Sequence, residues 1–107
     1  MKTEIPETQS RFLVRGGPRA LGAMDGLHDL LSNVAQQTTG RADMEGPVAG
    51  ARHTVLSGTA DFSSIQERLA FEEKAVAATE AKIAAHPKAR LKIVFAAHRA
   101  KPKAEPV

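Results

Sequence analysis

The sequence predicts a small α+β domain, and three observations lead to this prediction. Apolar residues recur at helical spacing in two stretches, residues 18–37 and 64–85. Short apolar or alternating runs near residues 11–15, 53–56 and 90–95 have the pattern of strands. The length of 107 residues suits one domain. We therefore expect two helices with two or three short strands, and a helical hairpin with extended arms is the alternative.

The first helix is predicted by apolar residues that follow a glycine-rich turn. The turn Arg15-Gly16-Gly17-Pro18-Arg19 ends the first strand, and Pro18 suits the first position of a helix. The apolar repeat that follows consists of Leu21, Met24, Leu27, Leu30, Leu31 and Val34. Gly22 and Gly26 weaken the prediction, because a glycine inside a helix costs about 1 kcal/mol relative to alanine. We expect a helix over 18–37 and a loop over 38–50, and a shorter helix capped by Asp25 is the alternative.

The second helix has the clearest beginning in the chain. The run Ser63-Ser64-Ile65-Gln66-Glu67 contains two overlapping capping boxes, Ser63 with Gln66 and Ser64 with Glu67. Pro87 disfavours helical geometry at the residue before it, so we expect this helix to end near Ala85.

A narrow apolar seam runs along the second helix. Leu69, Val76 and Ile83 recur every seven residues, and a row of alanines lies beside them, formed by Ala70, Ala77 and Ala84. Such a seam allows another helix to approach closely. We expect the seam to pack on the helix over 18–37, and packing on a second copy or on another protein is the alternative.

The chain has few large apolar side chains from which to build a core. Leu, Ile, Val and Phe account for 23 of the 107 residues, about a fifth, which is close to the level below which disorder is favoured. Alanine contributes 19 further residues, and each buries little area. We therefore expect a thin core that a partner surface or self-association helps to stabilise.

Positive charge gathers towards both ends of the sequence, although the net charge is only +3. Residues 11–20 contain no acid and hold Arg11, Arg15 and Arg19. The cationic residues near the C-terminus are Lys88, Arg90, Lys92, Arg99, Lys101 and Lys103. Arginine binds phosphate through two parallel hydrogen bonds, and helix N-termini attract anions. We expect these residues to contact an anion or a nucleic acid, without aromatic side chains for base stacking.

The sequence contains no pattern that indicates catalysis or metal binding. Because Cys is absent, disulfides, thiolate metal sites and thiol catalysis are excluded. The four histidines lack the spacing of metal ligands. Ser57-Gly58 lacks the first glycine of a nucleophile elbow, because Val55 stands in its place. We expect no enzyme activity, no catalytic residue, no metal, no cofactor and no small-molecule substrate.

These observations predict a non-enzymatic protein that works in assembly or protein–protein interaction, for example in a phage particle. Its partner is then another protein or a second copy. The alternatives are a nucleic-acid-binding accessory protein and a small inhibitor of a host complex. We expect an N-terminal arm over 1–10, one domain over 11–98 and a flexible basic tail over 99–107. The sequence has no signal-peptide pattern and no apolar run that could span a membrane, so a cytoplasmic or virion-associated location is expected, not secretion.

Overall fold

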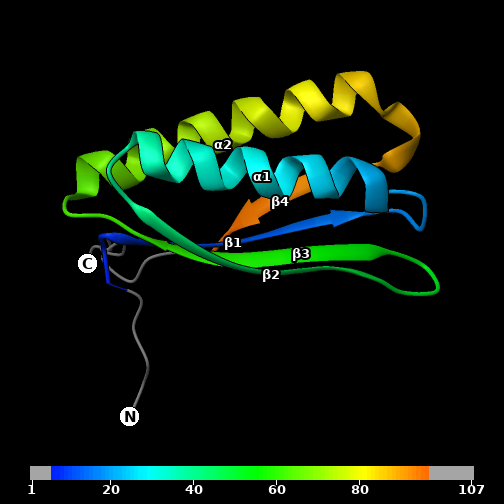
Figure 1. Cartoon of the computed structure of the whole chain (residues 1–107), viewed down its shortest axis with the longest axis horizontal. Helices are drawn as coiled ribbons and strands as arrows, with labels where there is room; N and C mark the ends of the chain where they lie inside the picture. Colours follow the sequence, from blue (N-terminus) through cyan, green and yellow to red (C-terminus); the bar gives the residue numbers. More distant parts are fainter. Residues whose placement is uncertain (1–5, 97–107) are drawn as a thin grey trace, which may run out of the picture.

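The computed structural model describes residues 6–96, which form four strands and two long helices (Figure 1). Strand β1 (Gln9–Gly16) leads into helix α1 (Leu21–Gln37). Strands β2 (Arg41–Ala49) and β3 (Thr54–Asp61) form a hairpin. Helix α2 (Ile65–Ala85), a short 3-10 helix η1 (Pro87–Ala89) and strand β4 (Lys92–Phe95) follow. No helix within residues 6–96 is long and apolar enough to cross a membrane.

The four strands belong to one antiparallel sheet in the order β2-β3-β1-β4. Central β1 pairs with β3 on one side and with β4 on the other. Both helices lie on the same face of this sheet (Figure 1), and no element within residues 6–96 covers the other face. This βαββαβ arrangement is the ferredoxin-like fold. The predicted α+β class is confirmed, and the alternative of a helical hairpin with extended arms is wrong.

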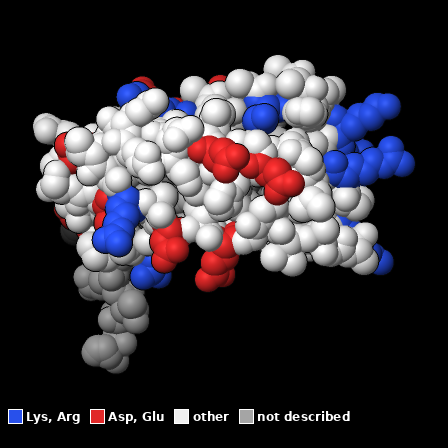
Figure 2. All heavy atoms as spheres, in the orientation of Figure 1, with Lys and Arg blue, Asp and Glu red and all other residues white. Residues whose placement is uncertain are grey.

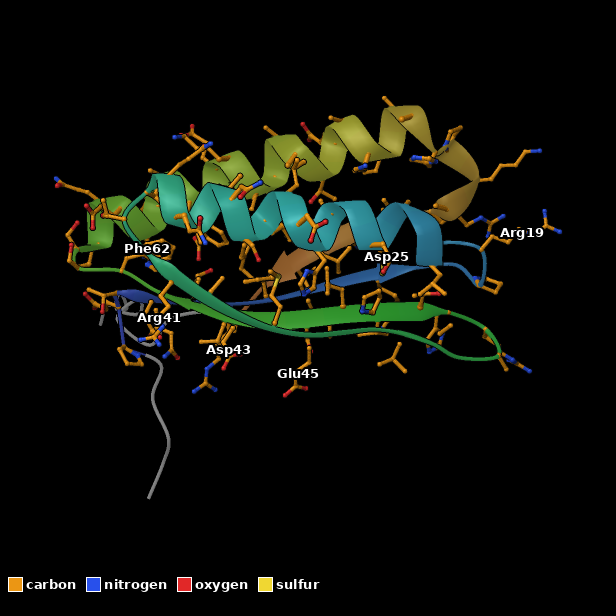
Figure 3. The ribbon with its side chains drawn as sticks, viewed as in Figure 1. Arg19, Asp25, Arg41, Asp43, Glu45 and Phe62 are labelled. Atoms are coloured by element: carbon orange, nitrogen blue, oxygen red, sulfur yellow. The ribbon has the colours of Figure 1, made fainter. Side chains whose placement is uncertain are left out.

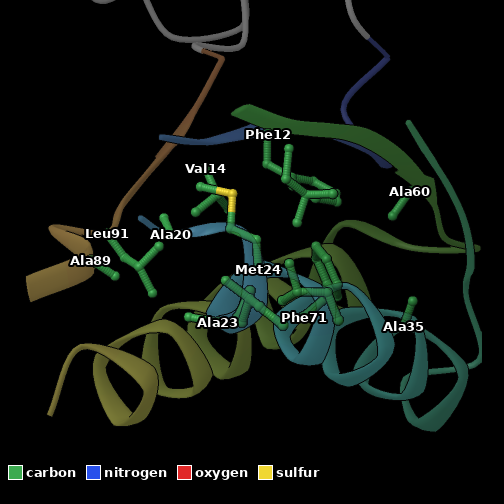
Figure 4. Packing of buried hydrophobic residues seen from close by; sticks show 14 of the residues in the cluster. Phe12, Val14, Ala20, Ala23, Met24, Ala35, Ala60, Phe71, Ala89 and Leu91 are labelled. Atoms are coloured by element: carbon green, nitrogen blue, oxygen red, sulfur yellow. The ribbon is translucent and has the colours of Figure 1, made fainter. Parts of the chain in front are cut away.

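The core lies between the sheet and the two helices (Figure 4). Phe71 of α2 is fully buried, and its ring centroid lies 5.7 Å from that of Phe12 and 5.1 Å from that of Phe62. Helix α1 contributes the long side chains Met24, Leu27 and Leu31, all fully buried. The buried residues of α2 are Phe71, Ala75 and Thr79. One aromatic ring therefore provides most of the apolar packing of α2.

The predicted start of α2 is confirmed at Ser64. Its side chain accepts a hydrogen bond from the backbone N–H of Glu67 at 3.1 Å, so Ser64 is the N-cap. The carboxylate of Glu67 accepts hydrogen bonds from the hydroxyl groups of Ser63 and Thr39. These bonds favour the charged form and lower the pKa of Glu67, with the bond from Ser63 as the larger cause. Of the predicted capping box between Ser64 and Glu67, the bond to the Ser64 side chain is therefore formed, whereas the Glu67 carboxylate accepts from the N–H and hydroxyl of Ser63 instead of the N–H of Ser64.

Helix α1 begins at Leu21, three residues later than predicted, and ends at Gln37 as predicted. The backbone N–H of Ala20 donates to the carbonyl of Gly17 at 3.1 Å, so residues 17–20 form a turn and Pro18 precedes the helix. Gly22 and Gly26 both lie inside α1. The alternative of a shorter helix capped by Asp25 is therefore wrong.

The prediction of a loop over 38–50 is wrong, because residues 41–49 form edge strand β2. Half-buried Ala42 and Met44 alternate with the exposed side chains of Arg41, Asp43 and Glu45. Only one face of β2 is covered, so the strand needs few apolar residues. A register irregularity between Glu45 and Val48 interrupts the alternation that would have indicated a strand.

Two predicted segment boundaries lie at the limits of the described residues. Strand β1 begins at Gln9, within the predicted N-terminal arm over 1–10. The predicted flexible tail over 99–107 lies outside the described residues.

Candidate functional site

Three connections meet at one end of the molecule: the β1–α1 turn, the β2–β3 hairpin and the segment between α2 and β4 (Figure 1). A surface depression of about 640 Å³ lies there, and no acidic side chain lines it. Its lining includes His53 and six cationic residues: Arg15, Arg19, Arg52, Lys88, Arg90 and Lys92. All six cationic residues are exposed. We call this set of six residues the basic end.

The backbone beneath the basic end is held by hydrogen bonds between distant segments. The N–H of Gly17 donates to the carbonyl of Ala89 at 2.7 Å. The hydroxyl of Thr54, a buried residue at the start of β3, donates to the carbonyl of Gly17 at 3.1 Å. A Cβ on Gly16 would lie 2.5 Å from the Cβ of Ala20, so only glycine fits at this position. The β1–α1 turn is thus fixed against η1 and β3.

The basic end places like charges close together. Arg15 and Lys92 are directly opposite each other in the β1–β4 pair, and both are exposed. Arg90 precedes β4 and has a left-handed backbone conformation, with φ of 55°. Like charges that face each other across a strand pair destabilise the sheet. No salt bridge within residues 6–96 neutralises any of the six cationic residues, so the local positive charge is available to an anionic partner.

Acidic side chains lie elsewhere on the surface. In Figure 2, lysine and arginine side chains gather without acidic neighbours at the right-hand end, whereas the middle and left of the view carry side chains of both signs. Figure 3 places Arg19 at the basic end, Asp25 on α1, and Asp43 and Glu45 on the open face of the sheet. The basic end is therefore a local concentration of positive charge on a surface that otherwise carries both signs.

The structure brings together several of the residues predicted to contact an anion. Arg15 and Arg19 lie beside Lys88, Arg90 and Lys92, which are distant in the sequence. The sequence analysis missed Arg52 and His53, because it did not predict the hairpin that carries them to this end. A single basic residue in a loop gives no signal unless the pairing of β2 with β3 is known.

The other predicted anion contacts do not belong to the basic end. Arg11 lies on the open face of the sheet, where its Nε donates to Oε1 of Gln9 at 3.0 Å. Arg11 also lines a separate depression that contains Asp43 and Glu45. Nearby carboxylates make that position less favourable for an anion than the basic end. Arg99, Lys101 and Lys103 lie outside the described residues.

The expectation that the seam of α2 packs on α1 is wrong. Leu69 is 51% exposed, Val76 36% and Ile83 37%. Of the adjacent alanines, Ala77 and Ala84 are exposed and Ala70 is half-buried. The seam lies about 80–120° around the helix from buried Ala75. The helix instead packs through Phe71, Ala75 and Thr79, which follow one another at four-residue spacing.

No family model and no curated protein matches the sequence. Several solved structures are similar in fold, among them the two that follow. The first is a candidate aminohydrolase from methicillin-resistant Staphylococcus aureus, with a TM-score of 0.63 and 9% sequence identity. That match covers 83% of this chain but only 29% of the aminohydrolase chain. The second is the de novo designed protein Ferredog-Diesel, with a TM-score of 0.58, 9% identity and coverage of 91% of this chain and 92% of the designed chain. At such identity, these similarities concern the fold alone.

Proposed function

We propose that this protein is a non-enzymatic binding module whose basic end binds the phosphate backbone of a nucleic acid. The observation that carries the proposal is the set of six exposed cationic residues around one depression without an acidic side chain. Phosphate groups of a nucleic acid offer the dense, regular negative charge that such a set complements. The turn at Gly16 and Gly17 supports this role, because hydrogen bonds to Ala89 and Thr54 fix the backbone that carries Arg15 and Arg19.

The chemistry of the basic end favours contact with the backbone over contact with the bases. The basic end holds only arginine and lysine, and no Phe, Tyr or Trp lines its depression. Aromatic side chains are the usual platforms on which single-stranded bases stack. Contacts to phosphate position a protein on a nucleic acid but carry no sequence information. We therefore expect binding with little sequence preference and with strong dependence on salt.

The salt dependence gives a quantitative test. Each phosphate that a cation neutralises contributes about −0.9 to the slope of log K against log [salt], so six contacts on duplex DNA give about −5. Binding of a fluorescein-labelled duplex of mixed sequence is measured by anisotropy at several KCl concentrations. The double variant Arg19→Gln, Lys88→Gln removes two contacts, and the slope should become shallower by about 2.

A matched control separates a local effect from a change in net charge. The double variant Arg41→Gln, Lys74→Gln removes the same charge from two exposed residues outside the basic end. Its slope should stay close to that of the unmodified protein. Equal changes of slope in the two double variants, or no binding at about 50 mM salt, where backbone contacts are strong, would reject the proposal.

A further inference from the structure

Helix α2 carries a second surface feature, and most of this feature lies away from the basic end. Four large apolar side chains are exposed there: Ile65 by 41%, Leu69 by 51%, Val76 by 36% and Ile83 by 37%. Their spacing places them within about 40° of one another around the helix, over a length of ~27 Å. We call these four residues the α2 stripe. Buried Phe71, Ala75 and Thr79 lie about 40–160° around the helix from the stripe residues. None of the four stripe residues belongs to the core cluster.

Two carboxylates follow the stripe on one side. Glu73 comes four residues after Leu69, and Glu80 comes four residues after Val76, so each lies next to the stripe. Both glutamates are exposed, and neither forms a salt bridge within residues 6–96. Alanines lie beyond the two glutamates, so the surface beside the stripe consists of small side chains and the two carboxylates.

The basic residues of α2 are directed elsewhere. Arg68 forms a salt bridge with Glu72, with 3.1 Å between Nη1 and Oε1. Lys82 reaches towards α1, since its Nζ would lie 2.6 Å from a Cβ placed on Gly26. Lys74 lies about 100° beyond Glu73 around the helix. The stripe is therefore flanked on one side by Glu73 and Glu80, and on its other side the cation Arg68 is paired with Glu72.

We infer that the α2 stripe binds an amphipathic helix of another protein that carries basic residues beside its apolar face. Helices recognise apolar surfaces through side chains at three-, four- and seven-residue spacing, which matches the stripe. A second copy is disfavoured as the occupant, because two α2 helices joined by their stripes would bring Glu73 and Glu80 of both copies to one interface. A helix with lysine or arginine at its flank instead complements these carboxylates. This inference is independent of the proposed role of the basic end.

Two synthetic helical peptides test the inference on the full chain. Both have the same leucine stripe, but one has lysines beside it and the other has glutamates. Binding is measured by anisotropy of the labelled peptides, and the binding surface is mapped by ¹H–¹⁵N NMR. The lysine peptide should bind at least about tenfold more tightly than the glutamate peptide, because it gains two surface ion pairs and avoids two repulsive contacts. Its shift changes should follow the α2 stripe.

Variants distinguish the stripe from general electrostatic attraction. Val76→Asp should weaken binding of the lysine peptide by at least about tenfold, since it places a charge in the apolar contact. Glu73→Gln, Glu80→Gln should reduce the preference between the two peptides to about twofold. The control Glu45→Gln removes an exposed carboxylate on β2 and should change neither value. Circular dichroism confirms that each variant is folded.

Three outcomes would overturn the inference. The first is equal binding of the two peptides, and the second is no binding of either. The third is a dimer of the isolated chain, seen by light scattering, whose NMR signals show the stripe to be covered.

Discussion

The packing of α2 predicts opposite results for two neighbouring apolar residues. Phe71 is fully buried between Phe12 and Phe62, whereas Leu69 is 51% exposed. Replacement of a buried phenylalanine by alanine removes its transfer free energy and leaves a cavity, at a cost of about 3–5 kcal/mol. Leu69→Ala removes a side chain that is only half shielded from water, so it should cost less than about 1 kcal/mol. The sequence pattern alone would have ranked these two residues in the reverse order.

Urea unfolding followed by far-UV circular dichroism measures both changes, because the chain has no Trp or Tyr to report by fluorescence. Small domains are stable by about 5–15 kcal/mol, so Phe71→Ala can leave little folded protein. Phe71→Leu keeps part of the buried volume and should lose about 1–2 kcal/mol, which remains measurable. A loss for Leu69→Ala that equals or exceeds the loss for either Phe71 variant would refute this assignment of the buried face.

Three further predictions concern local structure. Gly16→Ala should destabilise the fold and the basic end, because the new Cβ would lie 2.5 Å from the Cβ of Ala20. Gly17→Ala should be tolerated, because the nearest atom to its new Cβ is the carbonyl oxygen of Ala89 at 3.6 Å. Thermal unfolding compares the two variants. Gly22→Ala should raise the free energy of unfolding by about 0.5–1 kcal/mol, since alanine favours the helix and its Cβ meets nothing within 4 Å. A lower free energy of unfolding in urea would contradict this prediction. The pKa of Glu67 is lowered from its ordinary value of 4.5, so the ionised carboxylate should stabilise the fold at pH values above 4.5. This stabilisation should be lost as the pH falls through the lowered pKa. The stability difference between the unmodified protein and Glu67→Gln should therefore shrink in acid, and a constant difference between pH 7 and about pH 2 argues against the assignment.

The elements that sequence reasoning located have strong local signals. Ser64 and Glu67 form a cap whose chemistry is visible in the sequence, and Pro87 follows directly after the predicted end of α2. The alternation of Leu91, Ile93 and Phe95 likewise indicated β4. In these places the residues that define an element are close together in the chain, so they can be read without knowledge of the fold.

The elements that were missed depend on distant contacts. Strand β2 is polar because nothing within residues 6–96 covers its outer face, and an irregularity next to Glu45 hides its alternation. The buried face of α2 was missed because Ala75 and Thr79 are small, whereas Leu69, Val76 and Ile83 form a regular repeat on the exposed side. Periodicity identifies an apolar face but does not reveal whether that face is covered by the same chain.

In the candidate site too, some features have local sequence signals and others depend on distant contacts. The turn from Arg15 to Arg19 and the basic residues from 88 to 92 were found separately in the sequence. These two segments lie side by side because Arg15 pairs with Lys92 in the sheet and because Gly17 is hydrogen-bonded to Ala89. Arg52 joins them only through the β2–β3 hairpin. Sequence reasoning therefore predicted the residue types of the site, and the topology of the sheet determines their grouping.

The most direct test of the proposed basic-end function is an NMR titration of the ¹⁵N-labelled protein with an unlabelled DNA duplex of mixed sequence. We predict that the largest chemical-shift changes fall in residues 15–19, 52–53 and 88–92, and that they disappear when the salt concentration is raised. Changes centred on Arg11 and Arg41 of the open sheet face, or no changes at low salt, would contradict the proposal that the basic end binds nucleic acid.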